Sequence, residues 1–221
     1  MGGGVGMRSM VNQRKWILIA EDIGMGAAVF AITQLLIRIP ILQNVLAYQP
    51  WFQVLPYASP FLYGLFLAVT AGLAEEPGRY LGFWLLGKKH WDWRDGIAFG
   101  LGHGGTEAVW IFAMLAEQIQ AGASVSALGI AVAVLERISA VSFHVGASVM
   151  VLRGVKSGKK RWLFLAVILH TLLDLTAVWN ISLWAKEVLI FAAGAGFLVW
   201  AGKNRNKINQ EEKRGNIYEK E

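Results

Sequence analysis

Long apolar segments separated by short polar ones dominate the chain. Six segments are apolar and long enough, at about 1.5 Å per residue, to cross a hydrocarbon layer of roughly 30 Å. They lie at residues 16–38, 60–86, 96–117, 123–152, 161–184 and 185–201. Glu21 and Asp22 interrupt the first, and only a short turn around Lys186 and Glu187 separates the last two. The pattern predicts an all-α, polytopic membrane bundle of about six transmembrane helices.

Lysine and arginine gather in alternate loops of this arrangement. Three lie in the N-terminal arm, three in the 87–95 loop, five in the 153–161 loop and six in the tail from Lys203. The other set of loops holds only Arg38 and Lys186. Positively charged loops stay in the cytoplasm, so we expect both termini to be cytoplasmic, which an even number of helices satisfies.

Composition agrees with a cell-membrane location. The chain is 55% hydrophobic and 16% charged, with a mean hydropathy of +0.45. Basic flanks that face anionic lipid headgroups account for the net charge of +6, so no nucleic-acid partner is expected. Trp91 and Trp93, in the basic 87–95 loop, are typical of interfacial anchors. The absence of cysteine excludes disulfides and thiol catalysis.

No linker or internal repeat divides the chain, so residues 1–221 are predicted to form a single integral membrane domain. Its core, residues 60–180, carries the ionisable residues of the spans. The segment 203–221 has few apolar residues and is predicted to be a flexible cytoplasmic tail. The aromatic and proline-rich segment 39–59 is predicted to be an interfacial connector on the outer side, with a substrate-gating lid as the alternative.

Ionisable side chains lie inside the predicted spans, where they are costly and normally face a bundle interior or a watery cavity. His103, His144 and His170 fall at similar depths, roughly 10–13 Å from the predicted cytoplasmic ends of their helices. Four carboxylates lie slightly deeper, at roughly 15–19 Å. They are Glu75, Glu76, Glu107 and Asp174. Structural ion pairs alone would not need so many groups in one thin slab, so the set predicts a functional centre.

The spacing of these residues gives each helix one polar stripe. The pairs that share a helix face are Glu75 with Arg79, His103 with Glu107, His170 with Asp174, and Arg137 with His144. Polar stripes turn inward in lipid, so the stripes are expected to meet. Glu136 and Arg137 lie nearer the outer half, and a structural ion pair is the favoured interpretation of these two residues.

Local backbone signals coincide with the polar residues. Pro77 follows Glu76 and cannot donate a hydrogen bond to the carbonyl of Leu73, which predicts a kink. Glycines surround His103 at positions 100, 102, 104 and 105. They are explained equally well by close helix packing and by close approach of a substrate backbone.

Two chemistries fit this pattern. Glu75, next to Glu76 and one turn before Arg79, can serve as a general base that activates water. Histidines at the same level can orient water, protonate a leaving amine or stabilise an oxyanion. Several neutral histidines and a carboxylate can instead hold a zinc ion, although the chain contains no His-Glu-x-x-His motif.

Three short motifs, in chain order, resemble those of the CAAX-protease and bacteriocin-processing superfamily of glutamic intramembrane endopeptidases. Residues 75–79, 99–103 and 170–174 are similar to its Glu-Glu-x-x-x-Arg, Phe-x-x-x-His and His-x-x-x-Asn/Asp motifs. Three further segments are more similar to the bacterial YhfC branch of intramembrane metalloproteases. They are the Gly-His-Gly-Gly-x-Glu stretch ending at Glu107, the Glu136-Arg137 pair and Phe143-His144-Val145. The resemblance covers about residues 60–180.

The resemblance implies that Glu75 activates water with help from His103, while His170 and Asp174 stabilise the oxyanion. Glu76 belongs to the same catalytic set. The supporting residues would be Arg79, Glu107, Arg137 and His144.

Three departures from the superfamily pattern affect these roles. Only two residues separate Glu76 from Arg79, Asp174 replaces the more usual Asn, and His144 has no counterpart in the prenyl-protein endopeptidases. Because of this additional histidine, a metal centre remains an alternative to the metal-free glutamate mechanism. Its ligands would be His103, His144 and His170, with Glu75 or Glu76.

The leading prediction is an intramembrane endopeptidase that cleaves a membrane protein or peptide with Glu75-activated water. Its cavity at bilayer depth is expected to open to the cytoplasmic half. A proton- or cation-coupled transporter is one alternative, and it predicts internal repeats. A non-catalytic immunity or scaffold protein is another. The YhfC branch is also expected to begin with a further apolar helix.

Overall fold

A computed structural model describes the backbone of residues 3–85 and 91–218, and the side chains of residues 16–85 and 91–211. The elements are α1 (Gly3–Phe30), the π-helix η1 (Ala31–Arg38), α2 (Ile39–Asn44), the 3-10 helix η2 (Leu46–Tyr48), α3 (Pro50–Ala58), α4 (Pro60–Leu85), α5 (Trp93–Gln120), α6 (Ala127–Ser157), α7 (Arg161–Leu175) and α8 (Leu183–Tyr218). Every regular element in the described ranges is helical, which confirms the all-α class.

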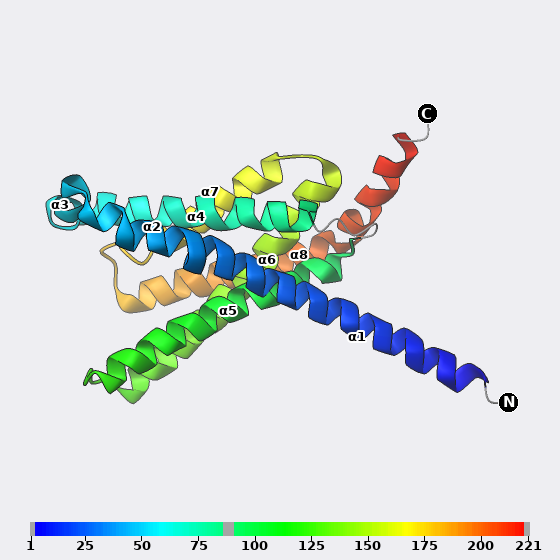
Figure 1. Cartoon of the computed structure of the whole chain (residues 1–221), viewed down its shortest axis with the longest axis horizontal. Coiled ribbons are helices and arrows are strands. Elements are labelled where there is room, and N and C mark those ends of the chain that lie inside the picture. Colours follow the sequence, from blue (N-terminus) through cyan, green and yellow to red (C-terminus); the bar gives the residue numbers. More distant parts are fainter. Residues whose placement is uncertain (1–2, 86–90, 219–221) are drawn as a thin grey trace.

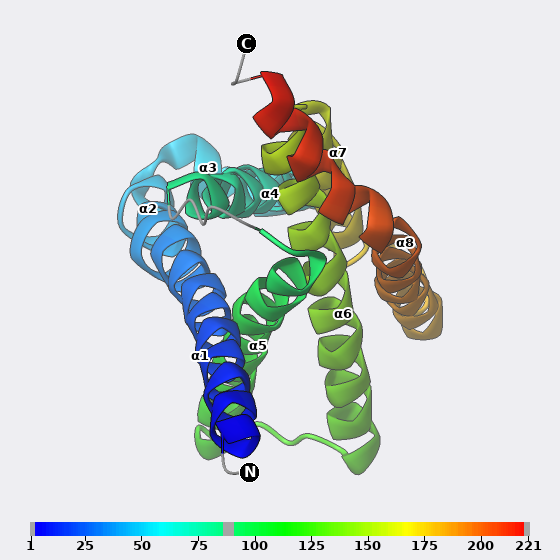
Figure 2. The same cartoon turned by 90° about the vertical axis from the view of Figure 1, so that its right-hand side faces the viewer.

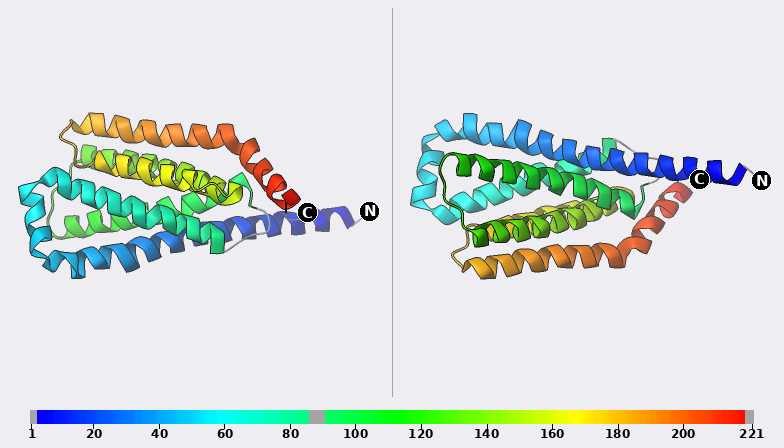
Figure 3. Two further views of the ribbon diagram at one scale, coloured as in Figure 1. Left: turned by 90° about the horizontal axis from the view of Figure 1, so that it is seen from above. Right: turned by 90° about the horizontal axis from the view of Figure 1, so that it is seen from below.

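The long helices run between two ends of the molecule (Figures 1 and 3). One end carries both chain termini, and we call it the N/C end. The other carries α3 and the turns that join α5 to α6 and α7 to α8, and we call it the α3 end. Helix α6 packs against both α5 and α8, α5 packs against α1, and α4 packs against α7 (Figure 2).

Three segments of the described chain are long and apolar enough to span a membrane by themselves. They are Trp16–Tyr48, Ala127–Ser157 and Leu183–Glu211. A fourth counts if α3 and α4, which meet at a 120° bend, form one broken span. Each of the six predicted segments overlaps a helix, but the number of spans and the orientation stay predictions. Part of the predicted 87–95 loop lies outside the described residues.

Some helix boundaries differ from the predicted ones for local reasons. The span predicted from residue 123 begins at Ala127, because the Ser126 hydroxyl accepts a hydrogen bond from the Gly129 N–H (3.0 Å) and caps the helix. The span predicted over 161–184 ends at Leu175 as helix, and turns follow. The helix of α4 continues through Pro77.

Glycines on α5 allow neighbouring helices to approach closely. A Cβ added at Gly102 would overlap the backbone carbonyl of Ile23 on α1, and one at Gly100 would lie 2.5 Å from the Cα of Val145 on α6. Nothing lies within 4 Å of a Cβ at Gly105. Helix packing therefore explains Gly100 and Gly102, as expected for small residues between membrane helices.

The segment 203–221 does not form a separate flexible tail in its described part, because α8 continues through it to Tyr218. Ile208 is fully buried, and the Arg153 guanidinium on α6 donates two hydrogen bonds to Glu211 Oε1, both at 3.1 Å. Composition alone could not show these partners on a neighbouring helix. Tertiary contacts of this kind supply most of the stability of helices in proteins.

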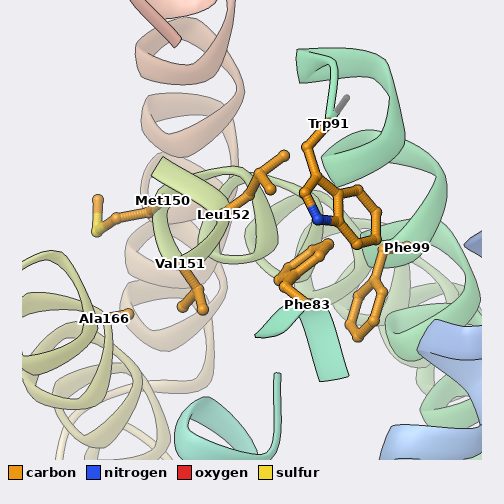
Figure 4. Close-up of a cluster of buried hydrophobic side chains, with 7 residues drawn as sticks. All are labelled: Phe83, Trp91, Phe99, Met150, Val151, Leu152 and Ala166. Atoms are coloured by element: carbon orange, nitrogen blue, oxygen red, sulfur yellow. The ribbon is translucent and has the colours of Figure 1, made fainter. Parts of the chain in front are cut away.

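Figure 4 shows a hydrophobic cluster, which we call the aromatic core. It lies toward the N/C end, because Phe83 and Trp91 are close to the end of α4 and the start of α5. Its buried members are Phe83, Trp91, Phe99, Met150, Val151, Leu152 and Ala166. The ring centroid of Phe83 lies 5.1 Å from that of Trp91 and 4.3 Å from that of Phe99. Trp91 was predicted to be an interfacial anchor. It is only 6% exposed, because its ring packs inside the protein against Phe83.

Candidate active site

The polar stripes of α4, α5, α6 and α7 meet at Glu75, which is 3% exposed. Its Oε2 accepts hydrogen bonds from Arg79 Nη2 (3.2 Å) and from His103 Nε2 (2.9 Å). His170 Nε2 and His144 Nδ1 lie 3.9 and 4.0 Å from the same oxygen. A bridging water suits separations of this size. The structure thus brings the three predicted histidines around one carboxylate oxygen.

His170 links Glu76 to Asp174. Its Nδ1 lies 2.7 Å from Glu76 Oε1, and a carboxylate can only accept, so Nδ1 carries the hydrogen. Nε2 is therefore the ring atom that faces Glu75 and, at 3.6 Å, Asp174 Oδ2. In the neutral ring this atom can accept a proton, and in the charged ring it can donate one.

His144 connects the centre to a second group of charges. Arg79 Nη2 lies 2.5 Å from His144 Nδ1, which must accept because a guanidinium only donates. His144 Nε2 then carries the hydrogen and bonds Glu107 Oε2. Arg137 donates to Glu107 Oε1 (2.8 Å) and also pairs with Glu136. The predicted Glu136–Arg137 ion pair is thus the outer end of a chain of contacts that starts at Glu75.

Two residues that the sequence analysis did not single out complete the centre. Gln34 Nε2 donates to Glu75 Oε1 (2.5 Å), and Arg38 Nη1 donates to Gln34 Oε1 (3.0 Å). Arg38 also donates to the Leu67 carbonyl (2.7 Å) and to Thr70 Oγ1 (3.2 Å). Both residues lie in η1, and π-helical segments are frequent at functional sites. Their four-residue spacing in an apolar span was the available signal.

A cavity of about 350 Å³ lies on one side of this centre. Six of the predicted site residues line it, and we call them the cavity set. They are Glu75, Glu107, Arg137, His144, His170 and Asp174. Three others are 0% exposed and lie behind Glu75, and we call them the buried set. They are Glu76, Arg79 and His103. Two of the residues predicted to be catalytic, Glu76 and His103, therefore do not line the cavity.

One group within the described residues has the donors for a metal ion. Glu75, His103 and His144 each offer a ligand atom, all within 4.8 Å of one another. Two imidazoles and a carboxylate are a donor set that zinc takes, and the bond from His144 to Glu107 is typical of a metal-bound histidine. The donors therefore fit zinc, provided that Arg79 turns away from His144. His170 and Glu76, predicted as further possible ligands, lie outside this group, and His170 Nδ1 is bonded to Glu76 Oε1.

Comparison with known proteins identifies the family. A family model described as "YhfC intramembrane metalloprotease" matches residues 5–123 and 112–193. The chain belongs to the YhfC family. The matched range includes every residue of the cavity set and the buried set, together with Gln34 and Arg38.

A relative in Bacillus subtilis (strain 168), described as "Uncharacterized membrane protein YhfC", is 30% identical over 169 residues. The alignment covers 63% of this chain and 64% of the relative, so the match spans slightly less than two thirds of that protein's length. No solved structure matches the chain. Family membership and the apolar helices make this YhfC protein a multi-pass membrane protein, as predicted. Placement in the wider CAAX-protease superfamily stays a prediction.

Proposed function

We propose that this YhfC family member is an intramembrane endopeptidase that hydrolyses a peptide bond of a membrane-associated protein or peptide. The observation that carries the proposal is the position of Glu75 Oε2. Glu75 borders the cavity, and its Oε2 lies within 4.0 Å of ring nitrogens from His103, His144 and His170. A carboxylate grouped with histidines in a cavity can remove a proton from water and return protons to a leaving group.

Hydrogen bonding leaves Glu75 able to hold a water molecule. A carboxylate offers about four acceptor positions, and Gln34, Arg79 and His103 use three of them. These donors also favour the ionised form, which a general base needs. The remaining position can accept a hydrogen bond from the water that attacks the substrate carbonyl.

His170 is suited to the second half of the reaction. Its Nδ1 is anchored to Glu76 at 2.7 Å, and its Nε2 faces the cavity near Glu75 and Asp174. A protonated Nε2 can stabilise the oxyanion and then protonate the leaving amine. Glu76 orients the ring in this scheme and does not need to touch the substrate.

A metal-assisted version of the same hydrolysis is the second candidate. The convergence of Glu75, His103 and His144, together with the description of the family, supports it. A zinc ion held by these three residues would activate water and polarise the substrate carbonyl. Glu107 would then orient His144 from the far side of its ring.

The proposal is tested by incubating the purified protein with a library of synthetic transmembrane peptides and identifying products by mass spectrometry. Glu75→Gln should lower the cleavage rate by about 10²–10⁴-fold, because it removes the proton acceptor and keeps the shape. Glu117→Gln is the matched control, since Glu117 is an exposed carboxylate on α5 that is not among the cavity-lining residues. Equal cleavage by wild type and Glu75→Gln would refute the proposal. Proton flux without any peptide cleavage would favour the transporter instead.

Elemental analysis of the same preparations separates the two versions. Stoichiometric zinc that is lost in His103→Ala and His144→Ala, but kept in His170→Ala, would establish the metal centre. Cleavage that continues in metal-free, chelator-treated protein would establish the metal-free glutamate version.

A further inference from the structure

We infer that the peptide substrate reaches Glu75 from the α3 end of the bundle, through the half of the bilayer that the charge pattern predicts to be extracytoplasmic. The inference rests on the proposed function in one respect only, which is that the ligand is an apolar peptide segment. It replaces the expectation from sequence that the cavity opens to the cytoplasmic half.

The cavity lining lies on one side of the polar centre in every helix that contributes to it. On α4 the lining residues run from Glu75 back to Gly64, and none follows Glu75. On α7 they run from His170 forward, and continue in the following turn to Val178. Gly64 and Glu75 are separated by about 16 Å along the helix axis. The cavity therefore extends from the centre toward the α3 end.

The other helices repeat this one-sided pattern. On α5 the lining begins after His103, with Glu107, and on α6 it ends at His144. Helix α6 runs from the α3 end toward the N/C end, so the lining again lies on the α3 side of the centre (Figure 1). Along α1 and η1 the lining begins only at Phe30 and includes Gln34 and Arg38.

The aromatic core fills the opposite side. Phe83 follows Glu75 on α4 by about 12 Å along the axis, and Phe83, Phe99 and Leu152 are each 0% exposed. Figure 4 shows the Trp91, Phe83 and Phe99 rings packed against one another between the surrounding helices. Within the described residues, closely packed side chains of this kind fill the space between Glu75 and the N/C end.

The charges of the two ends indicate which side of the membrane each faces. Most lysines and arginines belong to the N/C end, including those of the 153–161 loop. At the α3 end, Arg38 binds Gln34, and Lys186 donates to the Ala177 carbonyl (2.9 Å). The positive-inside rule then predicts that the α3 end faces outward.

The cavity walls suit an apolar peptide. Between the polar residues of the centre and the α3 end, the lining contains Leu67, Ala68, Ala71, Phe143 and Leu173. The small side chains on α4 leave space, and the larger ones offer apolar contact. A membrane peptide segment that enters from the outer half would lie against these apolar residues with its backbone beside Glu75. The charged residues Arg38, Glu136 and Arg137 also line the cavity.

The inference can be tested by thiol labelling, because the natural chain has no cysteine. Single variants Ala68→Cys and Ala71→Cys place a thiol in the cavity wall. A small cationic methanethiosulfonate that does not cross membranes is applied to right-side-out and to inverted vesicles. We expect at least a tenfold faster reaction of both cavity thiols in right-side-out vesicles.

Three further variants calibrate the experiment. Tyr57→Cys, at an 88% exposed position on α3, reports the side of the α3 end, and exposed Lys159→Cys reports the N/C end. Ala166→Cys, in the aromatic core, should remain unlabelled from either side. Melting temperatures show that each variant is folded.

The outcomes separate this inference from the proposed function. The inference would be overturned if the cavity thiols react only in inverted vesicles, as Lys159→Cys is expected to do. This holds even if Glu75-dependent cleavage is found. A failure to react in either vesicle type would also overturn it. Reaction in right-side-out vesicles supports the access route, even if no peptide is cleaved, in which case the proposed function fails alone. Labelling of Tyr57→Cys only in inverted vesicles would overturn the assigned direction.

Discussion

Glu75 and Glu76 are neighbours in the chain, but they lie in two different regions of the polar centre. Glu75 borders the cavity with the rest of the cavity set, whereas Glu76 is fully buried beside Arg79. Successive residues on an α-helix point about 100° apart, so Glu75 can face the cavity while Glu76 points into the protein interior. One short motif therefore provides both a candidate catalyst and a residue that holds another side chain in place.

The two regions should respond differently to substitution. The buried set brings a guanidinium, a carboxylate and an imidazole together out of contact with solvent, so the loss of one charge leaves another uncompensated. The cavity set borders a cavity of about 350 Å³, where neighbouring side chains have space to adjust to a substitution. Changes to the buried set should lower stability first, and changes to the cavity set should lower activity first.

The largest effect is expected from Arg79→Met. Arg79 lies 3.2 Å from Glu75 and 3.3 Å from Glu76, and all three are almost completely buried. Its removal should cost about 3–5 kcal/mol of stability, because two carboxylates lose their shared cation. Thermal unfolding in detergent measures the loss. Arg137→Met is the control, since Arg137 is only partly buried, and equal melting temperatures of the two variants would remove the distinction between the regions.

His170→Gln should lower activity more than stability, because the glutamine amide can still donate a hydrogen bond to Glu76. The change removes the ring nitrogen that faces the cavity, so the turnover number should fall by about 10²-fold or more. KM should change little, because the cavity walls remain. His103→Gln provides the comparison within the buried set, and we expect it to lower the melting temperature more than His170→Gln does. If His170→Gln keeps the wild-type turnover number, His170 has no role in the reaction.

Gln34→Leu tests the contact between η1 and the cavity set. The loss of a hydrogen bond to a charged group costs about 1.5–3 kcal/mol, which corresponds to roughly 10–150-fold in rate if Glu75 is misplaced. Gln34→Glu should be more harmful, since it places a second carboxylate against Glu75 Oε1. These predictions are checked by measuring the turnover number and the melting temperature of both variants. Full activity of Gln34→Leu would show that η1 does not position the general base.

The convergence of the histidines could be predicted because it depends on helix periodicity. A four-residue spacing puts His170 and Asp174 on one face, and polar faces in lipid turn inward regardless of the detailed packing. Gln34 was missed because its direction depends on a π-helical segment that ordinary 3.6-residue periodicity does not describe.

The direction of the cavity could not be predicted from depth alone. Position arithmetic places Glu75 nearer the N/C end, which suggested access from that side. The space between helices is instead set by side-chain packing, and Phe83 and Phe99 fill the shorter route. The order of α8 beyond residue 203 also depends on partners, such as Arg153, that lie far away in the sequence.

The smallest effect is expected from Asp174→Asn. The Asp174 side chain is 38% exposed, and its Oδ2 lies 3.6 Å from His170 Nε2, so solvent screens the pair. An exposed ion pair contributes about 0.2–1 kcal/mol, which predicts a loss of less than about tenfold in turnover and little change in melting temperature. An amide also keeps a hydrogen-bonding oxygen in place. A loss of turnover as large as that of His170→Gln would show that the charge of Asp174 acts in the reaction. Asp174 would then be a catalytic residue and not only part of the cavity wall.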